Sequence, residues 1–250
     1  MFLELLGIKV HYQKTGSKGK TVILLHGWGQ KLEMMEPIAK HLGNDFIVYN
    51  LDLPGFGLSD NLITPWGVFE YMLLLKEFID HFAIDSPIII SHSFGSRIAL
   101  LYSAKYPVYK MVITGGAGIL PKRSAWLKSK IKMYKFMKQA LLTFRLKTLQ
   151  QRLATYFGSE DYKQLNPLMR QSFNEIVNFD LRPYLPKITA EVLLVWGEKD
   201  EATPLWMGQI MEQEIRKAGL AIFEGDDHYA YWNQMPRFLA VCDVFLNEDK

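Results

Sequence analysis

Three side chains of this sequence are of the types that perform nucleophilic catalysis. Ser93 is the central residue of the motif SHSFG, Asp200 ends the motif WGEKD, and His228 ends the motif GDDH. A serine hydroxyl becomes a nucleophile only when a base removes its proton, and that base needs an acidic group to orient it. We therefore expect Ser93 to attack a carbonyl carbon, His228 to transfer its proton, and Asp200 to orient His228.

The surroundings of Ser93 predict a sharp turn between a strand and a helix. The apolar run PIII precedes the motif, and the helical pattern SRIALLYSAKY follows its glycine. The positions two before and two after such a serine must be small, because the turn is tight. Gly95 meets this condition, whereas Ser91 occupies a position where glycine is usual. Capping of the following helix is the structural alternative for Ser93.

Acyl transfer also requires hydrogen-bond donors for the oxygen that becomes negative in the transition state. The motif HGWG at 26–29 follows the apolar run TVILL, so its loop offers the backbone N–H of Trp28. The backbone N–H of Phe94, directly after the nucleophile, is the second predicted donor of this oxyanion hole. We interpret His26 and His92 as residues that support the site rather than as its base.

Short apolar runs rich in β-branched residues alternate with helical patterns along most of the chain. This alternation is typical of an α/β fold with a parallel sheet and helices on both faces. The expected strands cover residues 2–6, 9–14, 21–27, 46–52, 87–93, 111–116, 191–197 and 220–224. The expected helices cover residues 34–42, 69–82, 96–106, 206–218 and 237–246.

The interval 120–188 contains no strand-like run, so we predict a helical insertion between two strands of the sheet. Pro183 and Pro186 are expected to end it. Within the insertion, residues 121–152 hold ten Lys or Arg and no Asp or Glu. Three interpretations are open for this basic segment: a solvated helix face, weak contact with an anionic membrane surface, or steering of anionic substrates.

The chain resembles proteins of the α/β-hydrolase fold, of the single-domain bacterial type with a helical cap. Five motifs carry the resemblance, and they are HGWG at 26–29, DLPGFGLSD at 52–60, SHSFG at 91–95, WGEKD at 196–200 and GDDH at 225–228. The resemblance implies a mostly parallel, doubly wound core formed by residues 1–119 and 189–250, with 120–188 as a cap over the active site. It also implies the activity of small carboxylesterases, or of hydrolases that cleave carbon–carbon bonds beside a ketone.

Two residues depart from the family pattern. Ser91 replaces the usual glycine of the serine turn, and Asp227 stands before His228, where a small residue is more usual. A carboxylate at 227 could raise the basicity of the histidine or compete for its orientation. Asp226 and Asp227 are also the alternatives to Asp200, although residues adjacent to His228 have poor geometry for reaching its Nδ1.

Composition and charge exclude several other classes of protein. The net charge of +3 is too small to indicate nucleic-acid binding, and the single cysteine, Cys242, allows no intrachain disulfide. We find no signal peptide and no apolar run near the roughly 20 residues that span a bilayer, so we expect a cytoplasmic protein. The sequence has no metal-ligand motif, and DLPGFG lacks the lysine of a phosphate loop, so we expect no metal or cofactor.

The predicted activity is that of a serine hydrolase acting on a carboxylic ester whose substrate has an apolar portion. Large apolar side chains that could line the pocket favour such a portion. They are Trp28, Trp66, Phe94, Trp126, Trp206 and Tyr229. Thioesters, amides and carbon–carbon bonds beside a ketone are alternatives on the same triad. A non-catalytic ligand-binding or signalling protein is the alternative from another class, since a fold does not determine a function.

Overall fold

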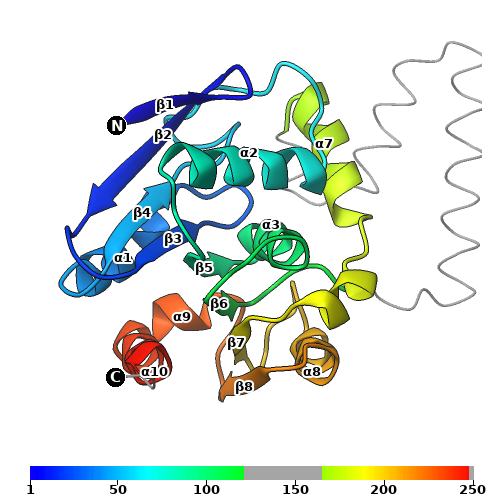
Figure 1. The fold of residues 1–250 in the computed structure, drawn as a ribbon. Coiled ribbons are helices and arrows are strands. Elements are labelled where there is room, and N and C mark those ends of the chain that lie inside the picture. Colours follow the sequence, from blue (N-terminus) through cyan, green and yellow to red (C-terminus); the bar gives the residue numbers. More distant parts are fainter. Residues whose placement is uncertain (121–164, 248–250) are drawn as a thin grey trace, which may run out of the picture.

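A computed structural model describes residues 1–120 and 165–247 of the chain. Its strands are β1 (Phe2–Leu5), β2 (Ile8–Thr15), β3 (Thr21–Leu25), β4 (Ile47–Leu51), β5 (Ile88–His92), β6 (Lys110–Thr114), β7 (Glu191–Gly197) and β8 (Ala218–Phe223). Within the described residues they form one sheet in the order β1-β2-β4-β3-β5-β6-β7-β8 (Figure 1). β2 pairs antiparallel with β1 and β4, and every other pair is parallel. The predicted mostly parallel α/β sheet is therefore confirmed.

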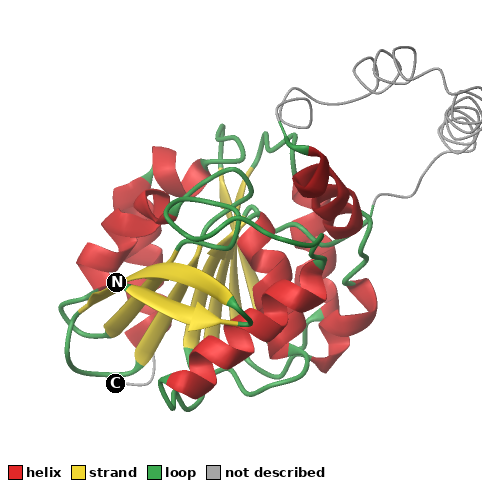
Figure 2. Ribbon diagram, turned by 90° about the horizontal axis from the view of Figure 1, so that it is seen from above, coloured by secondary structure: helices red, strands yellow, loops and turns green. Residues whose placement is uncertain are grey.

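Helices cover both faces of this sheet. The α-helices are α1 (Glu36–Leu42), α2 (Val68–His81), α3 (Phe94–Ser103), α7 (Pro167–Val177), α8 (Leu205–Glu214), α9 (Ala230–Asn233) and α10 (Met235–Asn247). Two 3-10 helices, η1 (Leu32–Met35) and η2 (Arg182–Lys187), complete the described elements. α1, α9 and α10 lie on one face, whereas α2, α3 and α8 lie on the other (Figure 1). Seen from above, the strands run between these two helical layers (Figure 2).

Strand β3 shows why the sequence has continuous apolar runs in place of alternating ones. Its residues Val22 and Leu24 pack into the apolar cluster on the side of α1 and α10. Ile23 and Leu25 point the other way, into the cluster that α2 and α3 share. Because successive side chains of a strand point to opposite faces, a strand buried on both faces must be apolar at every position.

Some element boundaries differ from those expected from the sequence. The helix expected over 206–218 ends at Glu214, because residues from Ala218 onward pair with β7. β8 lies at the edge of the sheet and is only partly buried, so its sequence lacks a strong strand pattern. Pro183 and Pro186, which are expected to end the insertion, lie inside η2, and β7 follows from Glu191.

Of the interval 120–188, the structure describes Leu120 and residues 165–188. The backbone N–H of Trp66 donates a hydrogen bond to Ser172 Oγ at 2.8 Å, which joins the loop before α2 to α7. Ile176, also in α7, is buried in the cluster shared with α2 and α3. The basic segment 121–152 lies outside the described residues. None of the described helices is long and apolar enough to cross a membrane.

The segment DLPGFG forms a tight turn after β4, as its glycines predict. Asp52 places its carboxylate inside this turn, where Oδ1 accepts from Leu32 N and Oδ2 accepts from Leu58 N. Gly57 has a φ of +57°, and a Cβ there would lie 2.1 Å from the Asp52 carboxylate. Glycine is therefore required at this position both by the backbone angle and by the space available.

Candidate active site

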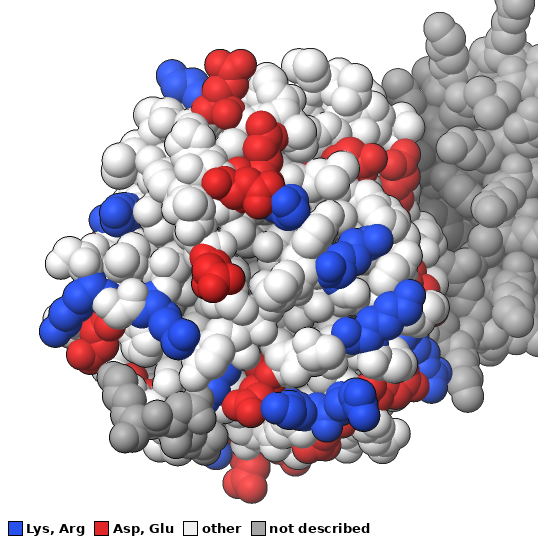
Figure 3. Space-filling view, in the orientation of Figure 1, with Lys and Arg blue, Asp and Glu red and all other residues white. Residues whose placement is uncertain are grey.

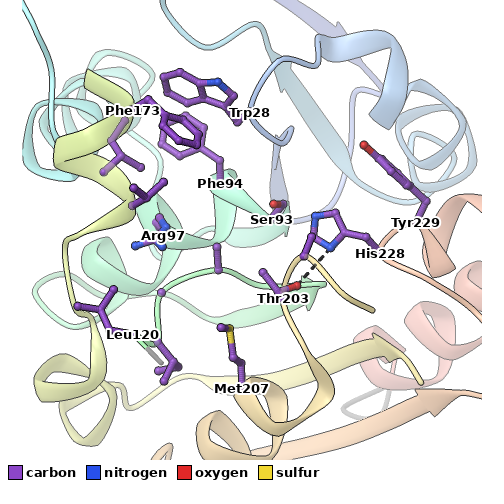
Figure 4. Close-up of a pocket in the computed structure, with 16 residues that line it drawn as sticks. Trp28, Ser93, Phe94, Arg97, Leu120, Phe173, Thr203, Met207, His228 and Tyr229 are labelled. Atoms are coloured by element: carbon purple, nitrogen blue, oxygen red, sulfur yellow. Dashed lines mark hydrogen bonds between the residues drawn. The ribbon is translucent and has the colours of Figure 1, made fainter. Parts of the chain in front are cut away.

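Ser93 stands at a strained turn between β5 and α3. Its backbone angles are φ +48° and ψ −107°, which a non-glycine residue rarely adopts. A Cβ on Gly95 would lie 2.5 Å from the carbonyl oxygen of Leu25, so only glycine fits there. The Ser93 side chain makes no capping hydrogen bond to α3. Its hydroxyl instead lines a cavity beside the ring of His228 (Figure 4).

Ser91, which stands where glycine is usual, has a hydrogen-bond partner in Ser96. Ser91 is fully buried, and its hydroxyl donates to Ser96 Oγ at 3.1 Å. Ser96 in turn donates to the carbonyl oxygen of Ser91 at 3.3 Å. Both buried hydroxyls therefore have partners, and the departure from glycine leaves no unpaired polar group in the turn.

His228 and Asp200, which lie on separate loops, meet in the structure. The Nδ1 of His228 lies 2.8 Å from Asp200 Oδ2. Asp200 Oδ1 accepts hydrogen bonds from the backbone N–H groups of Ala202 and Thr203, at 2.9 and 2.8 Å. Burial alone would raise the pKa of Asp200, but the hydrogen bonds and the charge of its partners outweigh burial and hold that pKa below its ordinary value.

The two neighbouring carboxylates have other partners. Asp227 Oδ1 accepts from the backbone N–H of Tyr229 at 2.8 Å and from Asn233 Nδ2 at 3.2 Å. Asp226 bonds with Asn233 and Gln234. Among the described residues, Asp200 is thus the carboxylate that hydrogen-bonds to the His228 ring.

Thr203 was not expected from the sequence. Its hydroxyl lies 2.8 Å from Asp200 Oδ2, 3.0 Å from the carbonyl oxygen of Gly115, and 3.2 Å from His228 Nδ1. The Thr203 hydroxyl and the His228 ring therefore contact the same oxygen of Asp200, and the hydroxyl helps to hold this carboxylate in place. A threonine three residues after an acid is a weak signal in a sequence, because most such residues only cap a turn.

The two predicted oxyanion donors border the same cavity. Neither the Trp28 N–H nor the Phe94 N–H donates to any acceptor among the described residues. His26 holds the Trp28 loop in place, because its Nε2 accepts from Leu53 N at 2.9 Å while its Nδ1 lies 2.7 Å from the oxygen of Gly27. Burial lowers the pKa of His26, which favours the neutral ring that this pattern needs.

The cavity has a volume of about 520 Å³ and is mostly apolar. Of the large apolar residues considered from the sequence, Trp28, Phe94 and Tyr229 line it. Trp66 and Trp206 pack in or against the core, and Trp126 lies outside the described residues. The remaining apolar lining is Ala117, Ile119, Leu120, Phe173, Ile176, Val177, Ala202 and Met207.

The sequence matches the model of the alpha/beta hydrolase family over residues 22–241. The chain belongs to this family. It is 25% identical to "2-hydroxy-6-oxononadienedioate/2-hydroxy-6-oxononatrienedioate hydrolase 1" of Pseudomonas putida, over 96% of this chain and 93% of the relative. The relatives are named as hydrolases, and the chain is a hydrolase.

Solved structures of other hydrolases share the fold of this chain. A membrane phospholipase A aligns with a TM-score of 0.78 at 22% identity, covering 99% of this chain and 85% of the other. An esterase from Exiguobacterium antarcticum aligns with a TM-score of 0.76 at 23% identity, covering 98% of each chain. At this identity the likeness shows the fold, which is that of the alpha/beta hydrolases.

The Thr203 hydroxyl is expected to position the Asp200–His228 pair of this hydrolase. Thr203→Val removes it at nearly constant volume, and we expect kcat to fall about tenfold with little change in KM. Thr203→Ser keeps the hydroxyl and should retain most of the activity. Steady-state kinetics of both variants on one ester checks this. A loss in Thr203→Ser as large as that in Thr203→Val would contradict this account, because Thr203→Ser keeps the hydroxyl.

His92 is a buried histidine that is neutral in the folded protein, and we expect it to affect the stability of the protein at acidic pH. Burial, reinforced by nearby His228, lowers the pKa of His92 from 6.5 to about 3. Between these values the unfolded chain binds a proton that the folded protein does not, so stability is highest above pH 6.5 and declines towards pH 3. We expect His92→Gln to flatten this decline by about 1 kcal/mol per pH unit.

Urea unfolding of wild type and His92→Gln between pH 4 and 7 measures this slope. His81→Gln is the matched control, because His81 is exposed and its loss should leave the slope as it is. Identical slopes in wild type and His92→Gln would contradict the account.

Proposed function

We propose that this hydrolase cleaves carboxylic esters through an acyl-enzyme, with Ser93 as nucleophile, His228 as general base and acid, and Asp200 as the orienting carboxylate. The observation that carries the proposal is the Asp200–His228 hydrogen bond of 2.8 Å in the wall of the cavity that Ser93 also lines. Since Asp200 occupies Nδ1 of His228, Nε2 is the nitrogen that can take the proton of Ser93.

The reaction then follows from these positions. Ser93 Oγ attacks the carbonyl carbon while its proton passes to His228 Nε2, and the N–H groups of Trp28 and Phe94 bind the resulting oxyanion. When the intermediate collapses, the ester C–O bond breaks and the alcohol leaves with the proton from Nε2. A water molecule next gives a proton to Nε2 and attacks the acyl carbon. Ser93 regains its proton, and the carboxylic acid is released.

A second candidate is the cleavage of a carbon–carbon bond beside a ketone. It is supported by the curated relatives, whose names describe oxo-dienoate and oxo-dienedioate hydrolases and which this chain covers almost completely. The carbonyl, the base and the oxyanion donors would be the same, and the carbon leaving group would take the proton from His228.

A fluorophosphonate probe tests the shared part of both candidates. The probe phosphonylates an activated serine, and we expect one adduct on the peptide that contains Ser93, found by mass spectrometry. Turnover of p-nitrophenyl esters from acetate to laurate then tests the ester proposal, and turnover of a 2-hydroxy-6-oxo-dienoate tests the second candidate. An adduct on another serine would reject the assignment of Ser93. Turnover of the ketone alone would replace the ester proposal.

The substrate is proposed to be a small molecule with an apolar portion, which the cavity lining supports. Acidic and basic side chains are interspersed on the face shown in Figure 3. That the protein binds no nucleic acid is also part of this proposal, and it rests on the net charge of +3. The weak contact of segment 121–152 with anionic membranes and the cytoplasmic location remain predictions. Sedimentation with anionic and neutral vesicles at low and high salt would test that contact.

A further inference from the structure

Arg97 contributes a basic side chain to the wall of the cavity. It lies one helical turn after Ser93 on α3, about 6 Å farther along the helix axis. Its exposed fraction is only 6%, yet it lines the cavity. Among the described residues that line this cavity, Arg97 is the only lysine or arginine, and none is an aspartate or glutamate.

The guanidinium has few partners. Its Nη1 donates to the carbonyl oxygen of Phe179 at 2.9 Å, and no other hydrogen bond of Arg97 occurs among the described residues. A guanidinium has five N–H donors in a planar fork that matches a carboxylate, so most of this capacity is unused. Asp180 attracts Arg97 at longer range, but no described carboxylate forms an ion pair with it. The Oδ1 of Asp180 accepts from the backbone N–H of Arg182.

A buried, unpaired cation is costly in an apolar wall, and it becomes favourable when an anion pairs with it. Burial lowers the pKa of Arg97 to about 10, so the group is still charged at neutral pH. In Figure 4, Ser93 lies between Arg97 and His228. Because the leaving group must sit beside His228 to receive its proton, the acyl part of a substrate is left to extend towards Arg97.

We propose that Arg97 binds a free carboxylate on the acyl part of the substrate, so that the preferred substrates are half-esters of dicarboxylic acids. The inference rests on the proposed ester hydrolysis and names its substrate class. Arg97 is a specificity-determining residue in this account. The apolar lining holds the carbon chain between the reacting carbonyl and the carboxylate.

The selectivity of the wild-type protein is the first test. Ethyl half-esters from succinate to adipate are compared with the same ethyl esters in which the free acid is a primary amide, and ethanol release gives kcat/KM. We expect the anionic ester to be preferred by about 10- to 100-fold at the best chain length, the usual effect of a charge-assisted hydrogen bond. Equal kcat/KM values for the acid and the amide would overturn the role of Arg97 and leave ester hydrolysis standing.

Variants then assign the selectivity to one side chain. Arg97→Met should lower the acid-to-amide ratio by the same 10- to 100-fold, and Arg97→Lys should lower it less, because lysine keeps the charge but not the fork. Arg182→Met is the matched control, since Arg182 pairs with Glu214 outside the cavity and its loss should leave the ratio unchanged. A ratio that Arg97→Met does not change would overturn the proposal.

A binding measurement separates this inference from the proposed function. Calorimetry with Ser93→Ala compares the adipate half-ester with its amide and needs no turnover. Tighter binding of the half-ester, lost in the Ser93→Ala/Arg97→Met double variant, would support the carboxylate site even if the wild type cleaved neither ester. Equal binding of both compounds would overturn the site. If Arg97→Met fails to fold, Arg97→Lys carries the test: a preference for the half-ester below that of the wild type would support the site, and an unchanged preference would overturn it.

Discussion

Ser93→Ala is expected to lower kcat for ester hydrolysis by about 10⁶-fold, to the residual rate that the oxyanion donors and binding alone supply. The reason is that no other described hydroxyl in the cavity has the position of Ser93, which the turn between β5 and α3 holds at a φ of +48° beside His228. The variant cannot form an acyl-enzyme. Its rate is measured on the best p-nitrophenyl ester, in single-turnover experiments with excess protein.

Folding of Ser93→Ala should be close to that of the wild type. The Ser93 side chain makes no capping hydrogen bond, and alanine inherits the same strained backbone angles without adding to them. Ser91→Ala is the matched control within the same motif, because the Ser91 hydroxyl donates to Ser96 Oγ and, among the described residues, has no partner at the reacting atoms. We expect less than about a tenfold loss there. A Ser93→Ala variant as active as Ser91→Ala would remove Ser93 as the nucleophile.

Asp200→Asn is expected to lower kcat by about 10⁴-fold while the fold stays intact. The side-chain NH2 of asparagine is a hydrogen-bond donor, and it would face His228 Nδ1, which now donates to Asp200. To accept this hydrogen bond, the imidazole ring must flip or take the tautomer with its proton on Nε2, and Nε2 could then not accept the proton of Ser93. Asn also has no charge with which to stabilise the imidazolium. Because the pKa of Asp200 lies below its ordinary range, the carboxylate stays charged at neutral pH, so the loss should persist across that range.

The control for this prediction is Asp227→Asn. Asp227 stands next to His228 in the chain, but its carboxylate bonds with Tyr229 and Asn233, so the loss should be modest. Measuring kcat and the rate of fluorophosphonate labelling for both variants separates the two carboxylates. A larger loss in Asp227→Asn than in Asp200→Asn would reassign the orienting acid to the neighbour of the histidine.

Local sequence patterns predicted the elements that form between residues close together in the chain. The turn at Ser93 was predictable because strand, small residue and helix follow one another within a few positions, and the structure places β5 and α3 there. The helix expected to reach Ala218 was wrong because β8 is an edge strand. A strand is expected over 220–224 from the sequence, but its first residues, from Ala218, are assigned by their pairing with β7, which no local window contains.

Sequence patterns predicted the order of the candidate catalytic residues, a serine, an acid and a histidine, and placed each of them after a strand of the sheet. The choice of the acid that hydrogen-bonds to the histidine came from the folded chain, because the pairing of β7 with β8 brings together Asp200 and His228, which are 28 positions apart in the sequence. The tertiary structure also revealed Thr203 and Arg97, whose roles come from burial and from partners distant in the chain. The identity of a polar residue does not indicate its solvent exposure or its hydrogen-bond partners in the folded protein. Both depend on the tertiary structure.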